Sequence, residues 1–253
     1  MDINGHINLL IGIDDTDNAE SRGTGFHARQ LAHALEASGH AKVNGITRHQ
    51  LFVNSAIRYT SQNSSACINM LSDNIKETAK ICEDYLVRHS APGSDAGLCI
   101  AAYDEITEEI MDWGMRAKYE VLNMPGAFDI ANRSGIYLQG FTGNHEGIIG
   151  AMAAIGLHAT GNDGRFIWRK GRKELRDIAA GVFTAKEIMN VLELDAISCL
   201  QGESPEQDDK IYINDWVRPI LKNHKAVLIT EKSEKHDEYE WKLTAKELIR
   251  TIS

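Results

Sequence analysis

The sequence has no apolar run of the roughly 20 residues that a membrane-spanning helix needs. The opening MDINGHINLL has no basic segment ahead of its apolar stretch, which a secretory signal peptide would have. Internal repeats and low-complexity tracts are also missing. We therefore expect a cytoplasmic protein without a membrane partner.

Paired cysteines are missing as well. The four cysteines stand at positions 67, 82, 99 and 199, and none belongs to a Cys-x-x-Cys pair. Zinc ribbons are built from such pairs, so the spacing argues against one. Single cysteines scattered through apolar segments are typical of buried thiols in a reducing compartment.

Positive charge is scarce. Lys and Arg number 27 and Asp and Glu 36, which gives a formal net charge of -9. Affinity for nucleic acids rests largely on Lys and Arg that neutralise phosphates. The acidic balance argues against a dedicated nucleic-acid-binding protein and leaves only a local basic patch open.

The 253 residues suffice for one large domain or two modest ones with a sizeable core. Apolar runs of strand length alternate with amphipathic helical stretches through the first half, which favours an α/β layered domain. In open α/β sheets, ligands bind beyond the carboxyl ends of the strands. Strands are expected near residues 8–13, 42–49, 66–71 and 97–103, and helices near 26–37, 75–86 and 104–122.

The last part of the chain has a different pattern. Residues 202–209 are polar, acidic and contain proline, which predicts a linker. Strand-like runs follow, and they predict a small β module that ends in a short helix. These runs cover residues 210–214, 226–230 and 239–243, with the helix near 245–252. The expected class is therefore α+β.

Residues 7–25 organise the chain. An apolar run reads as a buried strand and ends at three clustered carboxylates, Asp14, Asp15 and Asp17. Clustered carboxylates repel one another unless a cation lies between them, and Mg²⁺ commonly takes one or two carboxylates together with nucleotide phosphates. The cluster predicts a catalytic Mg²⁺ site. An acidic, solvated loop with ordinary turn glycines is the alternative.

The turn Gly23-Thr24-Gly25 follows the acidic loop and precedes a helix. Free amides at a helix start, together with the helix dipole, favour an anion. The turn therefore predicts a phosphate site beside the metal site. The Thr24 hydroxyl is a candidate catalytic group or a plain helix cap. His27 is a candidate base or a surface histidine.

Arg58 lies in the polar run 54–65 and is a candidate partner for a phosphate or carboxylate, because a guanidinium binds such groups with two parallel bonds. A surface charge is the alternative for this residue. Pro92 and Gly93 mark a turn just before a strand. Whether this turn meets the acidic loop is left open by the pattern.

Gly143 and Gly147 belong to a second glycine-rich element, which runs into the apolar helix 148–157. Such a turn holds a phosphate or carboxylate when its amides are free. Close packing of the helix against a sheet explains the same glycines equally well. The element is therefore a second candidate anion site, with packing as the alternative.

Four stretches together, IGIDDTDNAESRGTG, NSAIRYTSQNSSACI, APGSDAGL and GIIGAMAAIG, resemble the archaeal 2-agmatinylcytidine synthetases, which modify an isoleucine tRNA. The resemblance covers roughly residues 7–170, and GIDDTD is its most specific part. Members of that family use ATP and Mg²⁺ to phosphorylate the 2-carbonyl of a cytidine, which the amine agmatine then displaces. They combine a kinase-like domain, a ferredoxin-like domain, an OB-fold domain and a zinc ribbon.

This resemblance implies three segments here: a kinase-like ATP/Mg domain at 1–122, a ferredoxin-like domain at 123–200 and a small β module at 201–253. The acidic cluster would hold Mg²⁺ and ATP phosphates, with the turn 23–25 against the nucleotide. The Pro92-Gly93 turn and the glycine element at 143–150 would border the reaction and amine sites.

The family carries a Gly-Met-Cys-Thr-Thr run after its acidic cluster, and the first Thr is phosphorylated. Counted without gaps, residues 21–25 occupy that run here, so Thr24 falls on the first Thr and Gly25 replaces the second. The zinc ribbon is absent. We therefore expect a retained catalytic core whose macromolecular substrate has changed.

Three functional hypotheses follow. The first is an ATP- and Mg²⁺-dependent phosphotransferase or amine ligase that activates a carbonyl of an unknown small molecule or nucleoside. The second is a tRNA-modifying enzyme of the agmatinylcytidine synthetase type. The third is a non-catalytic nucleotide sensor, in which the altered run around Thr24 marks lost chemistry.

Overall fold

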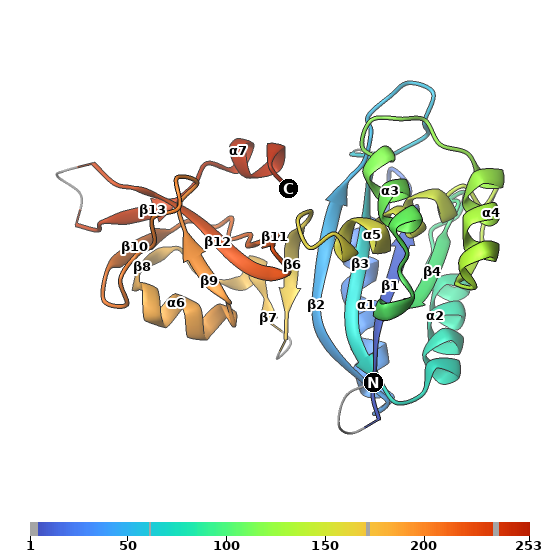
Figure 1. Ribbon diagram of the computed structural model, residues 1–253, viewed down its shortest axis with the longest axis horizontal. Coiled ribbons are helices and arrows are strands. Elements are labelled where there is room, and N and C mark those ends of the chain that lie inside the picture. Colours follow the sequence, from blue (N-terminus) through green and yellow to red (C-terminus); the bar gives the residue numbers. More distant parts are fainter. Residues whose placement is uncertain (1–4, 61, 171–172, 235–237) are drawn as a thin grey trace. The chain divides into compact units, whose positions relative to one another are not determined.

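The computed structural model describes residues 5–60, 62–170, 173–234 and 238–253. Contacts divide the chain into two compact units, Met1–Thr160 and Gly161–Ser253. The fold is mixed α+β, as the sequence predicts (Figure 1). In the described part of the chain, no helix has the length and apolarity to cross a membrane.

The first unit begins strand, helix, strand, strand, helix, strand and then adds three helices and a fifth strand. Its strands are β1 (Ile7–Asp14), β2 (Ala41–Gln50), β3 (Ser64–Ser72), β4 (Gly97–Ala102) and β5 (Tyr137–Gly140). Its helices are α1 (Thr24–Ala37), α2 (Ile75–His89), α3 (Glu108–Arg116), α4 (Met124–Ser134) and α5 (Ile148–Ala159).

These five strands form a sheet in the order β5-β4-β1-β3-β2, and every neighbouring pair is antiparallel. The alternation of strands and helices predicts the layers correctly. Ligands bind at the carboxyl ends of the strands in open, mostly parallel α/β sheets. This sheet is antiparallel, so each of its edges carries both carboxyl and amino ends of strands, and the rule does not select one edge. The first four strands with α1 and α2 have the connectivity and order of a split βαβ, ferredoxin-like unit.

Helices cover both faces of this sheet. α1 packs on β2 and β3 and contacts α2, while α5 packs on β1, β4 and β3 and is covered by α3 and α4 (Figure 1). α5 is apolar on all sides, so it needs neighbours all around it, and nearly all of its residues are buried. The thiols of Cys67 and Cys99 lie in this core, as predicted for single cysteines.

The helix predicted at 104–122 is shorter in the structure. α3 begins at Glu108 because the Thr107 hydroxyl accepts the N–H of Ile110 at 3.4 Å, and the helix ends at Arg116. α4 follows, with Asn123 as its N-cap and Gly135 in the left-handed conformation at its end. Helix α4 is not among the helices expected from the sequence.

The second unit contains the strands and the helix predicted for the C-terminal module. Its strands run in the order β6-β11-β12-β13-β10-β8, with β7 beside β6 and β9 beside β12. The strands are β6 (Arg165–Arg169), β7 (Lys173–Glu174), β8 (Gly181–Thr184), β9 (Ala196–Ser198), β10 (Lys210–Ile213), β11 (Ile220–Lys222), β12 (Lys225–Lys232) and β13 (Trp241–Leu243), and the helices are α6 (Ala185–Leu192) and α7 (Lys246–Thr251).

The linker predicted at 202–209 is part of this second unit. The Lys186 N–H donates to the Gln207 carbonyl at 3.0 Å, and the Ala185 N–H donates to the Asp209 carbonyl at 2.9 Å. The segment therefore supports the start of α6. Its polarity reflects exposure at the surface, and no unit boundary falls there.

The division into 1–122, 123–200 and 201–253 stays a prediction. Contacts separate the chain at Thr160, inside the segment expected to be ferredoxin-like, because α5 packs on the N-terminal sheet. The ferredoxin-like strand order lies in residues 7–102, within the segment that the family resemblance predicts to be kinase-like.

Candidate active site

Four loops meet at one edge of the first sheet. Asp14 at the end of β1 pairs with Gly97 at the start of β4, and Gly97 also pairs with Gly140 at the end of β5. On the other side of β1, Ile13 pairs with Ala66 near the start of β3. The antiparallel order therefore gathers the acidic loop, the polar run, the Pro-Gly turn and the second glycine element.

The acidic loop and the Pro-Gly turn are directly bonded. The Ala91 N–H donates to the Thr16 carbonyl at 2.9 Å, and the Asn18 side-chain amide donates to the Pro92 carbonyl at 3.1 Å. The topology therefore brings the Pro-Gly turn against the acidic loop, a contact that the sequence pattern alone leaves open.

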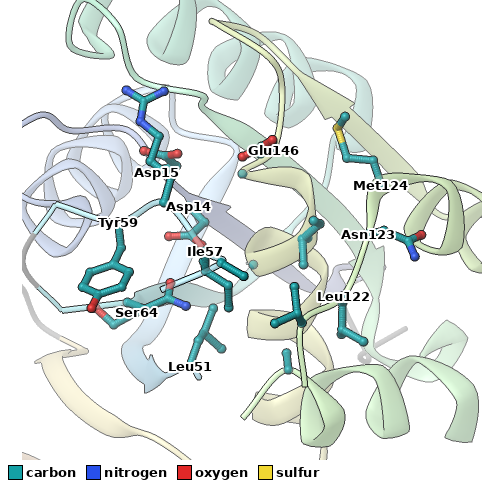
Figure 2. Close-up of a pocket in the computed structure, with 18 of the residues that line it drawn as sticks. Asp14, Asp15, Leu51, Ile57, Tyr59, Ser64, Leu122, Asn123, Met124 and Glu146 are labelled. Carbon is teal, nitrogen blue, oxygen red and sulfur yellow. The ribbon is translucent and has the colours of Figure 1, made fainter. Parts of the chain in front are cut away.

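The acidic loop, the polar run, the second glycine element and residues of 117–125 between α3 and α4 line a cavity of about 330 Å³, and the Pro-Gly turn supports it from outside. Figure 2 shows Asp14, Asp15 and Glu146 gathered in one part of it, and Leu51 and Leu122 in another. The cavity therefore has a charged end and an apolar end. Its size and mixed lining suit a small ligand with one ionic and one apolar part.

Asp14 lies at the charged end and is half-buried. α5 approaches it so closely that a Cβ at Gly150 would lie 1.8 Å from its Oδ2 atom, so only glycine fits at position 150. Burial, and then the charge of Asp15, raise the pKa of Asp14 to about 8. The raised pKa means that the negative charge of Asp14 is disfavoured at this position, and a bound cation would stabilise that charge.

Asp15 follows with a left-handed backbone, φ 48°, which non-glycine residues rarely adopt. Burial, and then the charge of Asp95, raise the pKa of Asp15 to about 6, while the nearby Arg58 opposes the rise. The left-handed backbone is a strained feature of the kind that clusters at functional sites.

Asp17 caps helix α1. Its Oδ1 atom accepts the Thr24 N–H at 3.0 Å and the Thr24 hydroxyl at 2.9 Å, and its Oδ2 atom accepts the Thr60 hydroxyl at 2.8 Å. One backbone amide of the turn predicted as a phosphate site, that of Thr24, is therefore already bonded to Asp17. Gly23 is the N-cap residue and Gly25 lies in the first turn.

Asp17→Ala is expected to lower the free energy of unfolding by about 1–2 kcal/mol, because the first turn of α1 loses its side-chain acceptor. Urea unfolding measures the change. Thr60→Val is the control, since it removes only the bond at the second oxygen and should cost less than about 0.5 kcal/mol. Equal losses in the two variants would contradict the capping role.

Arg58 reaches the Pro-Gly turn and lines the cavity. Its Nη1 atom donates to Asp95 Oδ2 at 2.9 Å, and its Nη2 atom donates to the Gly93 carbonyl at 2.6 Å. Asp95 is buried, and sequence reasoning missed it although the run APGSDAGL contains it. A serine-aspartate pair after Pro-Gly is ordinary turn chemistry, which masks such a role.

The second glycine element packs closely against the turn. Gly143 has φ 54°, and a Cβ there would lie 1.8 Å from Asp95 Oδ1. The Gly147 N–H donates to the Asp95 carbonyl at 2.8 Å, so this amide is not free for an anion. Of the two explanations that the sequence allows, these contacts favour close packing. Gly147 lines the cavity, whereas Pro92, Gly93 and Gly143 support the loops behind it.

His27 does not line the cavity. Its ring lies against Tyr85 of α2, with Nδ1 3.2 Å from the phenol oxygen, and burial lowers the pKa of its imidazole. Thr24, one helical turn earlier, does line the cavity. The candidate base therefore belongs to the contact between α1 and α2.

The described residues contain no group of three or more His, Cys, Asp or Glu side chains arranged to hold a metal ion by themselves. Asp14 and Asp15 offer hard oxygen ligands in a crowded, partly dehydrated position. Mg²⁺ is usually held by one or two carboxylates, with water and substrate phosphates completing its shell. The donor set therefore fits Mg²⁺ bound together with a nucleotide.

No protein-family model and no curated protein matches the sequence. Solved structures do match. A tRNA fluorescent labeling enzyme is 22% identical with a TM-score of 0.53, over 59% of this chain and 36% of that one. Apo TiaS, an agmatidine synthetase that acts on an isoleucine tRNA, is 21% identical with a TM-score of 0.51, over 59% and 35%. The complex of TiaS with this tRNA and ATP is 22% identical with a TM-score of 0.53, and the match covers 60% of this chain and 36% of that one.

The chain therefore matches only about a third of the length of these enzymes. At this level of identity the likeness concerns the fold. It agrees with the resemblance that the sequence motifs carry. Over about 59% of its length, this chain shares its fold with the tRNA agmatidine synthetase TiaS.

Proposed function

We propose that this chain is an ATP- and Mg²⁺-dependent enzyme of the agmatidine synthetase type, which activates a carbonyl for displacement by an amine. The observation that carries the proposal is that Asp14, Asp15 and Glu146 gather in one part of a cavity while Leu51 and Leu122 lie in another (Figure 2), and that Arg58, whose charge acts on Asp15, also lines this cavity. A nucleotide has the matching halves, a triphosphate and a planar base.

In this proposal Asp14 and Asp15 hold Mg²⁺, which neutralises charge on the phosphates when it is bound. Arg58 contributes N–H donors to the same phosphates. Leu51 and Leu122 pack against the base, because its faces are apolar. The Thr24 hydroxyl already donates to Asp17, which places an acceptor for its proton at 2.9 Å. Thr24 is therefore a candidate phosphoryl acceptor.

For the acceptor, a cytidine in tRNA is the first candidate. The similar solved structures include a complex of TiaS with its tRNA, AMPCPP and agmatine, at a TM-score of 0.52. By analogy, the present chain would join an agmatine-like amine to a tRNA base. The matched region is about a third of the length of TiaS.

A small molecule or a free nucleoside is the second candidate acceptor. The net charge of -9 opposes close approach of a polyanion, and no cysteine pair has the spacing of a zinc ribbon. A cavity of about 330 Å³ has the size of a small-ligand site. A nucleotide sensor without turnover is the remaining alternative, favoured by Gly25 in place of a threonine.

The test is incubation with ATP and Mg²⁺, with and without agmatine and tRNA, followed by quantification of ADP and AMP. We expect nucleotide products that Asp15→Asn reduces at least about 100-fold, since a ligand to the ion is lost. Stimulation by tRNA would select the first acceptor. ATP binding without products under all conditions would overturn the enzymatic proposal in favour of a sensor.

A further inference from the structure

Asp95 connects three of the four loops at the cavity. Its Oδ2 atom accepts Arg58 Nη1 at 2.9 Å, and its Oδ1 atom accepts the backbone N–H of Asn144. Its own carbonyl accepts the Gly147 N–H at 2.8 Å. One residue therefore ties the polar run and the second glycine element to the turn before β4.

The Asp95 carboxylate is held in a fixed position. The residue is only 1% exposed, and a buried charge is stable only when its oxygens are paired and hydrogen-bonded. Both oxygens have partners. A Cβ at position 143 would lie 1.8 Å from Asp95 Oδ1, so the backbone of Gly143 lies close against this oxygen. Asp95 therefore offers a rigid anchor to whatever it binds.

Arg58 needs such an anchor. Its side chain is 61% exposed, and a free arginine at the surface samples many rotamers that it must give up on binding an anion. The contacts with Asp95 and Gly93 use two of its five N–H donors. Among the described residues the other three have no hydrogen-bond acceptor, so they remain for a ligand in the cavity that Arg58 lines.

We propose that Asp95 is a positioning residue, which orients Arg58 so that its guanidinium meets the phosphates of a nucleotide in the cavity. The inference rests on the proposed function. Asp95 does not line the cavity, so it acts through Arg58. An arginine fixed in advance loses less freedom on binding, and its contribution to affinity is larger.

The test is a double-mutant cycle on the full chain, with dissociation constants measured for ATP with Mg²⁺ and for adenosine. Asp95→Asn and Arg58→Ala are each expected to weaken ATP binding about 10-fold. The double variant should be no weaker than Arg58→Ala alone, because the two residues act as one unit. Adenosine, which has no phosphate, should bind all variants equally.

Asp84→Asn is the matched control. It removes a carboxylate from the exposed ion pair with Arg88 on α2, 3.6 Å long and away from the cavity, and should leave both ligands unaffected. Additive losses in the cycle would overturn the proposal. An equal loss of adenosine binding would also overturn it, because a general disturbance of the cavity would explain both.

Hydrogen exchange tests the contact between Asp95 and Arg58 independently of nucleotide binding. Without any nucleotide, the amides of residues 54–60 should exchange faster in Asp95→Asn while the unfolding midpoint is kept. If the wild type binds neither ligand, the nucleotide function fails, and faster exchange still supports the tie between Asp95 and Arg58. Unchanged exchange overturns the positioning role in either case.

Discussion

Asp14→Asn is expected to weaken binding of ATP with Mg²⁺ about 100-fold while making the ligand-free protein more stable. The two effects share one cause, because Asp14, with its pKa raised to about 8, must take up a proton on folding at pH 7 when no cation is present, and its carboxylate is needed to hold the ion. Asparagine keeps the shape and needs no proton uptake on folding. In the presence of a chelator, the free energy of unfolding should rise by about 2 kcal/mol at pH 7.

The measurements are urea unfolding in the presence of a chelator and ATP titration with Mg²⁺. Asp104→Asn is the control, since Asp104 is exposed and does not line the cavity, and it should change neither quantity. A loss of stability in Asp14→Asn would contradict the account. It would mean that the carboxylate stabilises the loop in the absence of any ion.

Gly12→Ala is expected to destabilise the first unit by about 3 kcal/mol. Gly12 lies in the middle of β1, and a Cβ there would stand 1.9 Å from the backbone carbonyl oxygen of Ala151 in α5. The helix backbone cannot yield without losing its packing on the sheet. Displacement of α5 would also move Gly150 away from Asp14, so ATP binding should fall as well.

Hydrogen exchange of β1 and α5 peptides measures this effect within the first unit. Gly23→Ala is the matched control, because the nearest atom to a Cβ there is Asp17 Oδ2 at 3.9 Å, and the change should stay within about 0.5 kcal/mol. If Gly12→Ala keeps wild-type protection in both elements, the close packing of α5 on β1 is wrong.

Local patterns in the sequence predict the parts of the candidate site that lie within one stretch. The strand into Asp14, Asp15 and Asp17 follows from an apolar run and the acids after it, and all three line the cavity. The helical period also predicts that His27 faces the protein interior, because it lies one turn before the buried Leu31 on the same face of the helix.

The rest depends on strand pairing across long stretches of chain. The position of Asp95 beside the acidic loop follows from the antiparallel pairing of β1 with β4, which no local pattern encodes. The second glycine element looks like an anion loop in sequence, and its packing role is revealed by the contacts of Gly143 and Gly147 with Asp95 and by the approach of Gly150 to Asp14. Composition alone does not distinguish an amide that is free from one bonded to a neighbouring loop.

The most direct test of the central claim is a calorimetric titration of the full chain with ATP, in Mg²⁺ and in a chelator. The account predicts saturable binding that weakens at least about 10-fold without the ion and is lost in Asp15→Asn. Binding that Asp15→Asn leaves unchanged, or no binding at all, would contradict it, because the carboxylates at the end of β1 would then be only a solvated acidic loop.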